Sequence, residues 1–504
     1  MSASTVATAP PEETTKLHHD PNTTSTTSDQ QHARPIRSRF FQWVPTDDEQ
    51  VRLVEQRILA GLVYTQRIVA GINTISSPSW DRENSGKKHT VVLVHGFAGG
   101  LGCWAQNWES LSKVYNVHAI DLPGFGRSVR DDRSFDGPQD AMKYYFDALH
   151  KWFGEVGIPP NQPITVVGHS FGGYVLSHYT MELLWRKRKL EDALEAPVLD
   201  HELLASPAPK VPPSSSCKKS SHNSAKSQQQ DTTVPKVVIP PPNIVHLVLA
   251  DPWGVPPKYK RVLPFKFRVL IKLFYKVSPL AILRCAGPWG PNLLPKVRPD
   301  FAERWDHLPD PLIFYDYTYH SNAQTPATGE LAFQACCEGA AFARLPLLLY
   351  IPEMLRCIST GVDTTANIQA AAQEFKQKKQ EEVSSSPNPQ LQKPEPSDTA
   401  APTPATMTER NKKSTPRTPL TVSSGMKKTT APLSHLTLLH GDHTWMDTAM
   451  YQRLVDQLLG DGTVGNVSIG SIVSAGHQLN TDNSEDFNMK LGEAIRRGVR
   501  SSSK

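Results

Sequence analysis

One serine of the chain lies in a pattern that enzymes use for nucleophilic attack. It is Ser170, in the segment Gly168-His169-Ser170-Phe171-Gly172-Gly173, which matches G-x-S-x-G. A serine hydroxyl is a poor nucleophile near neutral pH unless a base lies beside it to take its proton. The pattern fixes only three residues and arises by chance in roughly one chain of this length in six. The prediction that Ser170 is a nucleophile therefore depends on the elements around it.

Those elements have the order of a nucleophile elbow. Residues 164–167 have the apolar pattern of a buried strand that enters the motif, and residues 174–184 that of a helix that follows it. In the elbow of the α/β-hydrolase fold, a sharp turn lifts the serine above the sheet, and the flanking glycines relieve crowding. The backbone N–H groups of Phe171 and of Phe97, in a glycine-rich loop, are predicted to form an oxyanion hole.

A general base is expected near the carboxyl end, because this fold carries its residues in the order serine, acid, histidine. His477 follows a strand predicted at residues 467–473 and is the candidate. The acid is expected after the strand at residues 436–439, where Asp442 and Asp447 both offer a carboxylate. Asp442 also suits a turn and Asp447 a helix N-cap, so the residues alone leave the acid open.

No metal and no cofactor are predicted for this chemistry. His440 and His443 stand near the expected acid, but no further ligand lies at a spacing typical of zinc sites. The six cysteines are scattered and form no C-x-x-C pair, which argues against a zinc site and against a disulfide framework.

The sequence predicts an α/β fold. Strand patterns end at the motifs already named and alternate with helical segments; they lie at residues 89–93, 115–120, 164–167, 244–249, 436–439 and 467–473. Such alternation favours a mainly parallel central sheet with helices on both faces. Ligands of these sheets bind beyond the carboxyl ends of the strands, where the candidate residues fall.

The folded part is predicted to be a single α/β-hydrolase domain over residues 38–500, with an inserted, mostly helical cap at about 255–358. Residues 1–37 and inserts at about 206–235 and 372–432 are rich in Ser, Thr, Pro, Gln and Lys. Such segments bury too little apolar surface to offset the entropy of ordering, so we expect them to be disordered. The inserts are also candidate sites for a protein partner.

Composition excludes several classes. The amino terminus lacks the basic and apolar regions of a secretory signal, and no apolar run reaches 18 residues, so we expect an intracellular protein without a membrane span. A net charge of +5 over 504 residues gives no footprint for nucleic-acid binding.

The chain resembles the family of α/β-hydrolase domain proteins 4 and 5, which includes a fungal cardiolipin deacylase and plant relatives. The resemblance spans essentially the whole folded part and rests on motifs at Trp43–Thr46, His95–Gly100, Asp121–Ser128, Gly168–Gly173, Leu249–Gly254, Gly287–Pro291, Arg298–Phe301 and Tyr319–Gln324. The family's G-x-x-x-x-x-D stretch maps its acid onto Asp447 rather than Asp442. Its terminal H-x-x-x-x-D motif maps onto His477 and Asp482 and is associated with acyl transfer from acyl-CoA to lysophosphatidic acid.

The resemblance implies a serine hydrolase that cleaves acyl esters of phospholipids or N-acyl phospholipids through an acyl-enzyme. One alternative is a lysophosphatidic acid acyltransferase, for which acyl-CoA would be a co-substrate. The other is a lipid-surface adaptor that regulates a partner lipase. The expected place of action is cytoplasmic and peripheral, on a lipid droplet, the endoplasmic reticulum or a mitochondrial membrane.

Two segments are candidates for contact with a lipid surface. Residues 252–299 contain no acidic residue, and within the helix predicted at 264–277 the side chains of Arg268, Lys272 and Lys276 fall on one face. The aromatic residues of Phe40–Trp43 are the second candidate.

Overall fold

The computed structural model describes residues 46–78, 88–195, 240–258, 280–286, 290–305, 310, 312–339, 342–385 and 433–502. Several predictions fall outside these ranges: the disordered 1–37 and 206–235, the aromatic segment 40–43 and the basic helix 264–277. They stay predictions.

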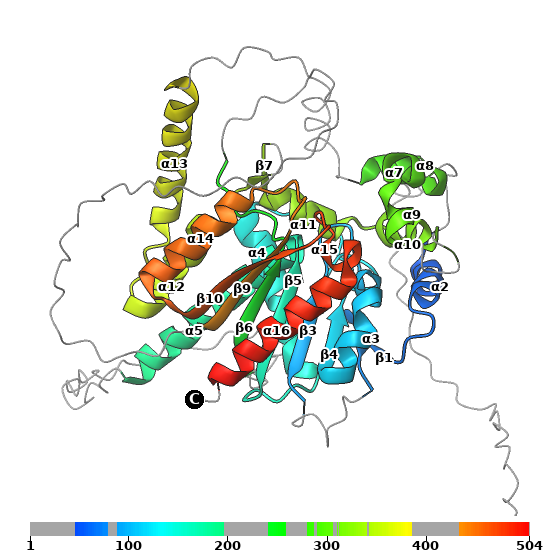
Figure 1. Cartoon of the computed structure of the whole chain (residues 1–504), viewed down its shortest axis with the longest axis horizontal. Helices are drawn as coiled ribbons and strands as arrows, with labels where there is room; N and C mark the ends of the chain where they lie inside the picture. Colours follow the sequence, from blue (N-terminus) through cyan, green and yellow to red (C-terminus); the bar gives the residue numbers. More distant parts are fainter. Residues whose placement is uncertain are drawn as a thin grey trace, which may run out of the picture.

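A mainly parallel sheet organises the described chain, as predicted (Figure 1). Its strand order is β1-β2-β4-β3-β5-β6-β9-β10. The strands are β1 (Thr65–Val69), β2 (Ile72–Ser76), β3 (Thr90–Val94), β4 (Asn116–Ile120), β5 (Pro163–His169), β6 (Asn243–Ala250), β9 (Leu433–Gly441) and β10 (Val464–Ile472). The strands from β4 to β10 pair in parallel, whereas β2 pairs antiparallel with both β1 and β4. The hairpin of β1 and β2 adds two strands that were not among the strands predicted from the sequence.

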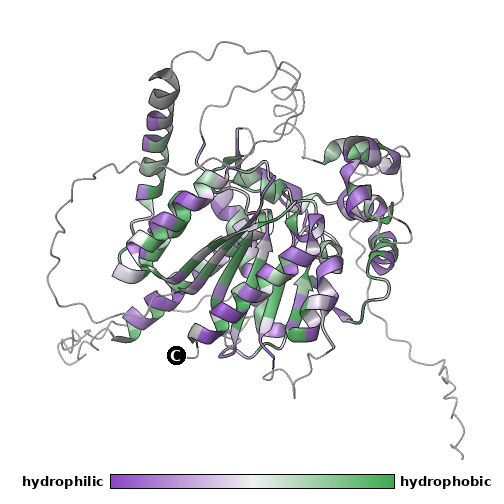
Figure 2. Ribbon diagram, viewed as in Figure 1, coloured by the Kyte–Doolittle hydropathy of each residue, from purple (hydrophilic) through white to green (hydrophobic). Residues whose placement is uncertain are grey.

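Alternating side chains of the central strands supply two hydrophobic cores. In β3, Val92 and Val94 point to one side, where α4 (Pro138–Glu155), α5 (Phe171–Glu195), α12 (Leu347–Thr360) and α14 (Thr448–Asp461) pack. Val91 and Leu93 point to the other, where α2 (Asp48–Ile58), η1 (Leu101–Trp104), α3 (Ala105–Val114), α15 (Leu479–Asp482) and α16 (Ser484–Ser502) pack. Figure 2 shows the strands as mostly hydrophobic and the helices as two-sided, as burial on one face requires.

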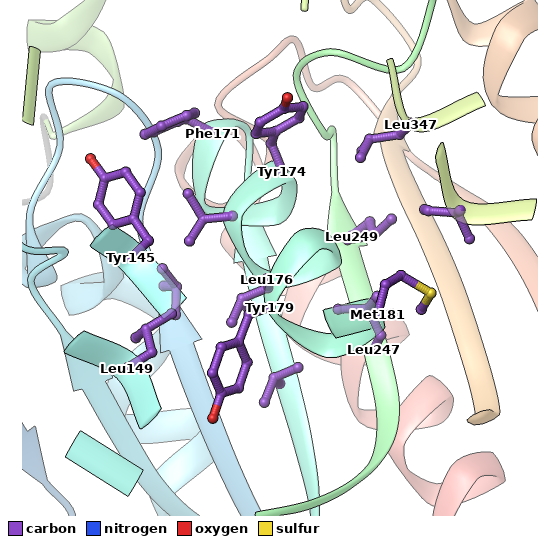
Figure 3. Packing of buried hydrophobic residues seen from close by; sticks show 14 of the residues in the cluster. Tyr145, Leu149, Phe171, Tyr174, Leu176, Tyr179, Met181, Leu247, Leu249 and Leu347 are labelled. Carbon is purple, nitrogen blue, oxygen red and sulfur yellow. The ribbon is translucent and has the colours of Figure 1, made fainter. Parts of the chain in front are cut away.

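Helix α5 begins directly after the serine, and its packing on the sheet fixes the position of Ser170. Its residues Phe171, Tyr174 and Leu176 lie beside Leu247 and Leu249 of β6 in the first of these cores (Figure 3). All five residues have an exposed fraction of 0%. Burial of one such side chain stabilises a fold by roughly 1.5 to 3 kcal/mol, so the start of α5 is firmly seated on the sheet.

The predicted cap region, about 255–358, includes most of α12, which packs on the sheet; before α12 it contains short helices and a small hairpin. They are α7 (Ala281–Cys285), α8 (Gly290–Val297), α9 (Asp300–Arg304), α10 (Ile313–Ala323), α11 (Thr328–Cys336), β7 (Cys337–Glu338) and β8 (Phe342–Ala343). Helices α7 to α10 stand at one end of the sheet next to α2 (Figure 1). Tyr317 of α10 accepts a hydrogen bond from the backbone N–H of Gly102 at 3.0 Å, which ties this group of helices to η1.

One segment predicted to be disordered is partly helical. Helix α13 (Ala366–Ser385) extends into the expected insert at 372–432, whose residues from 386 on lie outside the described ranges. The helical part is rich in Ala, Gln, Glu and Lys, which favour helices, and Glu374 pairs with Lys378 one turn along at 2.5 Å. Phe375 is buried in the core. The composition of the insert did not predict this apolar contact, which helps to hold the helix on the core.

After its two longest internal gaps, the described chain resumes at the same edge of the sheet. It enters β6 after residues 196–239 and β9 after residues 386–432, in each case at the amino end of the strand. The candidate residues lie at the carboxyl ends, on the opposite edge.

Buried histidines make the stability of the fold sensitive to acid. Burial lowers the pKa of four of them to about 3, namely His118, His169, His178 and His246. In the unfolded chain each binds a proton below its ordinary pKa of 6.5, whereas in the folded chain it stays neutral. Their contribution is therefore complete above pH 6.5 and is lost as the pH falls from 6.5 towards 3.

We expect each such histidine to cost about 1.4 kcal/mol per pH unit below 6.5. Urea unfolding at pH 7.5, 6.5 and 5.5 measures the slope. His178→Phe keeps an aromatic ring on Tyr350, whose ring centre lies 3.9 Å from that of His178, and should make the slope shallower by one proton. Tyr350→Phe, which leaves the histidine in place and changes no group that titrates between pH 5.5 and 7.5, should leave the slope unchanged. An equal slope in wild type and His178→Phe would contradict the expectation.

Candidate active site

Ser170 stands on the sharp turn predicted for it, between β5 and α5. Its φ is +51°, in the left-handed region that residues other than glycine seldom adopt. A Cβ at Gly168 would lie 2.5 Å from the backbone N of Gly173, and one at Gly172 would lie 2.4 Å from the carbonyl oxygen of His95. Only glycine fits at both positions, so the two glycines of the motif permit the sharp turn on which the serine stands.

The serine hydroxyl belongs to a chain of hydrogen bonds with a histidine and a carboxylate. Ser170 Oγ lies 2.9 Å from Nε2 of His477, and Nδ1 of His477 lies 2.5 Å from Oδ2 of Asp251. A carboxylate only accepts, so Nδ1 carries the proton and Nε2 is left to accept from the serine hydroxyl. The histidine is thereby in the tautomer that removes a proton from Ser170.

Asp251 is the carboxylate at the histidine, which corrects the expectation that Asp447 or Asp442 would be. Asp447 occupies the N-cap position of α14. Asp442 accepts from the backbone N–H of Ser474 and of Ala475 at 2.9 and 3.0 Å. These hydrogen bonds, with His443 beside it, lower the pKa of Asp442 to about 2. Asp442 thus fills the role of a turn residue, and Asp447 stands at an N-cap position, where its side chain makes no capping hydrogen bond.

The register of the sheet explains why Asp251 meets the histidine. In the parallel pairing of β5 with β6, His169 lies opposite Ala250, so Ser170 and Asp251 both follow directly from paired positions. Asp251 has a φ of +44°, and its side chain is completely buried. The signal in the sequence was a carboxylate that directly follows an apolar strand between serine and histidine, but the pairing of that strand was not readable.

Two further hydroxyl groups hold the carboxylate. Thr444 donates to Oδ2 of Asp251 at 2.6 Å, and the phenol of Tyr451 donates to Oδ1 at 3.2 Å. Thr444 comes from the loop in which the acid was expected, and Tyr451 comes from α14, which follows that loop. A buried carboxylate is stable only when its oxygens are hydrogen-bonded, so this loop supports the acid instead of supplying it.

The loop that carries His477 is held by side chains on its backbone. The N–H groups of residues 473–476 donate to the carboxylates of Asp486, Asp442 and Asp482. Nε2 of His169 donates to the carbonyl oxygen of His477 at 2.8 Å, and burial lowers the pKa of His169 to about 3, so this ring stays neutral. The histidine therefore has a fixed backbone as well as a fixed ring.

The two predicted oxyanion-hole groups flank the serine. Phe171 is the first residue of α5, where backbone N–H groups have no acceptor within the helix. Phe97 follows Gly96, and a Cβ at Gly96 would lie 3.0 Å from Cβ of Ser170. The ring of Phe97 stacks on that of Phe333 at 4.2 Å between centres, which fixes its loop beside the serine.

Asp482, the second residue of the H-x-x-x-x-D motif, lies near His477 but is not hydrogen-bonded to its ring. Both ring nitrogens of His477 have other partners. Asp482 instead accepts from the N–H of Gly476 at 2.8 Å and pairs with Arg304 of α9. The carboxylate of Asp482 therefore binds the backbone of the histidine loop and Arg304, not the imidazole of His477.

Within the described residues, no group of three or more His, Cys, Asp or Glu side chains is arranged to hold a metal ion. In the same ranges, none of the helices combines the length and the apolar character that a membrane crossing needs. A cavity of about 670 Å³ lies between α4, α5 and α12, and its lining contains none of Ser170, Asp251 and His477. It is separate from the serine site.

Comparisons with known proteins point to acyl ester chemistry. A model of the "Alpha/beta hydrolase family" matches residues 91–383. The (lyso)-N-acylphosphatidylethanolamine lipase of Bos taurus is 31% identical over 317 residues, which cover 60% of this chain and 73% of the lipase. The 1-acylglycerol-3-phosphate O-acyltransferase ABHD5 of Rattus norvegicus is 28% identical over 271 residues, covering 53% of this chain and 59% of that protein.

Among solved structures, one described as a membrane phospholipase A and bacterial virulence factor is 15% identical and has a TM-score of 0.44, with 90% of this chain and 91% of the other covered. The two curated relatives confirm the resemblance to α/β-hydrolase domain proteins 4 and 5 that the motifs predicted.

Proposed function

Since the chain belongs to the α/β-hydrolase family, we propose that it is a serine hydrolase that removes an acyl chain from a phospholipid or an N-acyl phospholipid. The observation that carries the proposal is the series Ser170 Oγ, His477 and Asp251, with distances of 2.9 and 2.5 Å. The name of the bovine relative, an N-acylphosphatidylethanolamine lipase, supports the substrate class.

In the proposed reaction, Nε2 of His477 takes the proton of Ser170 as Oγ attacks the ester carbonyl carbon. The N–H groups of Phe171 and Phe97 donate to the oxygen that becomes negative. As the carbon–oxygen bond to the glycerol breaks, His477 returns the proton to the leaving alcohol, and the acyl chain remains on Ser170. A water molecule, deprotonated by His477, then releases the fatty acid. Asp251 stabilises the imidazolium in both steps.

The acyl acceptor separates the proposal from its two rivals. Purified full-length protein is mixed with vesicles that contain phosphatidylethanolamine, its N-acyl form or cardiolipin, each with a labelled acyl chain, with and without lysophosphatidic acid. We expect free labelled fatty acid from at least one lipid. If the label appears only on lysophosphatidic acid, the protein is an acyltransferase and not a hydrolase. If all lipids stay intact under all conditions, the result favours the lipid-surface adaptor.

Contact with a lipid surface is supported by one side chain next to the serine site. Trp445 is 65% exposed, and its ring centre lies 5.1 Å from that of His477. An exposed tryptophan is costly in water, and its ring with one N–H suits the boundary between lipid tails and water. We propose that Trp445 enters the lipid surface when the site takes up its substrate.

Replacement of Trp445 should therefore affect lipid in vesicles more than a dissolved ester. We expect Trp445→Ala to lower the ratio of the vesicle rate to the rate on a short-chain soluble ester by roughly fivefold, as loss of about 1 kcal/mol of apolar contact implies. Leu459→Ala, at an exposed leucine of α14, is the matched control with an unchanged ratio. Equal ratios for wild type and Trp445→Ala would remove Trp445 from the lipid contact.

A further inference from the structure

A cluster of carboxylates holds the loop in front of His477, and one of them has a partner in another part of the fold. Asp486 pairs with Lys490 and Asp442 with His443, so both are paired with residues near them in the sequence. Asp482 pairs with Arg304, which lies 178 positions away in the chain. It is the member of the cluster that links the histidine loop to the cap region.

We propose that Asp482 is a positioning residue for His477. Its carboxylate joins the N–H of Gly476 to the guanidinium of Arg304, so that the seating of α9 in the cap region sets the position of the histidine. The inference rests on the proposed function, because it assigns a way to place the base of that reaction. It gives the H-x-x-x-x-D motif a role other than acyl transfer.

The contact is well placed to be strong. The side chains of Asp482 and Arg304 are only 10% and 19% exposed, so the pair is partly shielded from water. Nε of Arg304 donates to one oxygen of Asp482, and the N–H of Gly476 donates to the other at 2.8 Å. Charge-assisted hydrogen bonds of this kind are roughly twice as strong as neutral ones.

Both ends of the contact are anchored. Asn480, two residues before Asp482 on α15, donates to the carbonyl oxygen of Cys103 at 2.9 Å, which fixes α15 on η1. On the other side, Arg304 also pairs with Asp300 of its own helix. The pKa of Asp300 is lowered to about 2 by its hydrogen bonds with Arg298 and by Arg304, so it stays charged at neutral pH. Arg304 is thus held between Asp300 and Asp482.

The loop itself needs such support. Ser474 has a φ of +54°, a strained value for a residue other than glycine. Strained backbone persists only where its surroundings fix it, and here the fixing contacts are hydrogen bonds from successive N–H groups to carboxylates. Loss of one contact should allow the loop, and His477 with it, to move relative to Ser170.

Hydrogen exchange tests the mechanical part without any activity. We expect Asp482→Asn and Arg304→Gln to raise exchange in a peptide that covers residues 473–477 by about tenfold or more, as loss of a charged hydrogen bond implies. The matched control is Arg57→Gln, which removes ion pairs between α2 and Asp310 and Asp316 but leaves the histidine loop untouched. Unchanged exchange in both variants of the pair overturns the proposal.

Kinetics test the consequence. Both variants should slow labelling of Ser170 by a fluorophosphonate, and kcat on a soluble ester, by about tenfold, since a misplacement of 1 Å can cost about a hundredfold. The double variant should be no worse than either single one, because both break the same link. Arg304→Lys should restore part of the rate. Additive losses, or equal losses in Arg57→Gln, would reduce the pair to a general stabiliser and overturn the proposal.

The two proposals fail in different ways. If wild type is not labelled by the fluorophosphonate at all, the proposed hydrolase activity fails, whereas faster exchange of residues 473–477 in the variants would still support the link from α9. If wild type is labelled and the exchange of the loop does not change, the link fails and the hydrolase activity stands.

Discussion

Asp251→Asn is expected to lower kcat for ester hydrolysis by about four orders of magnitude. Three donors surround the carboxylate of Asp251, from His477, Thr444 and Tyr451. An asparagine amide nitrogen at either oxygen position would face one of these donors. The Nδ1–H of His477 would then lose its acceptor, and the tautomer with an unprotonated Nε2, which accepts the proton of Ser170, would no longer be favoured. Steady-state rates on a soluble ester measure the effect.

The control for this experiment is the acid that the motifs had indicated. Asp447→Asn removes a carboxylate from the N-cap position of α14 and should change kcat by no more than about threefold. The stability should change little, because the Asp447 side chain makes no capping hydrogen bond and asparagine is as favourable as aspartate at an N-cap. Melting temperatures of both variants show that they remain folded. A drop of several orders of magnitude in Asp447→Asn, with near-normal rates in Asp251→Asn, would mean that the carboxylate beside His477 is not the one that assists it.

Ser170→Ala is expected to lower kcat by about five to six orders of magnitude, because without Oγ no acyl-enzyme can form. Labelling by a fluorophosphonate, which requires an activated serine, should disappear. The free energy of unfolding should fall by no more than about 1 kcal/mol, because the change removes a single hydrogen bond, to a histidine side chain that is 16% exposed.

Ser177→Ala is the matched control for Ser170→Ala. Ser177 is a buried serine about two turns along α5, and its hydroxyl donates to the carbonyl oxygen of Gly173 at 2.8 Å. It has no contact with His477, so labelling and rate should stay at the level of wild type. Persistent labelling in Ser170→Ala would place the reactive serine elsewhere.

The local features of the site were predictable from the sequence. Ser170 and its glycines occupy neighbouring positions, and the strand before them and the helix after them are short-range patterns. His477 was found because it follows the last strand. Each of these predictions needs only the residue types within one element and the order of the elements along the chain.

The acid was not predictable in the same way. The choice between Asp251 and Asp447 depends on which strand ends lie next to the histidine, and that is set by the pairing of β5 with β6 and of β6 with β9. Register across a parallel sheet joins residues far apart in the sequence. Asp447 carried the local signal of a helix N-cap, and the structure uses it in that position. The link from Asp482 to Arg304 was hidden for the same reason, since its two ends are 178 positions apart.

The chain enters β6 and β9 at the edge of the sheet opposite the candidate site, so changes in the length of the preceding segments fall far from the site. The candidate residues Ser170, Asp251 and His477 lie at the carboxyl edge of the sheet, where a shift of an ångström would matter for the proposed reaction. Residues 196–239 and 386–432 precede β6 and β9 in the chain, which the described residues enter at the amino edge, and each doubling of a connection's length costs only about 0.6 kcal/mol. A sheet of parallel strands keeps these edges apart by the length of a strand. The protein can therefore diverge in length and composition at one edge while the arrangement of Ser170, Asp251 and His477 stays constant at the other.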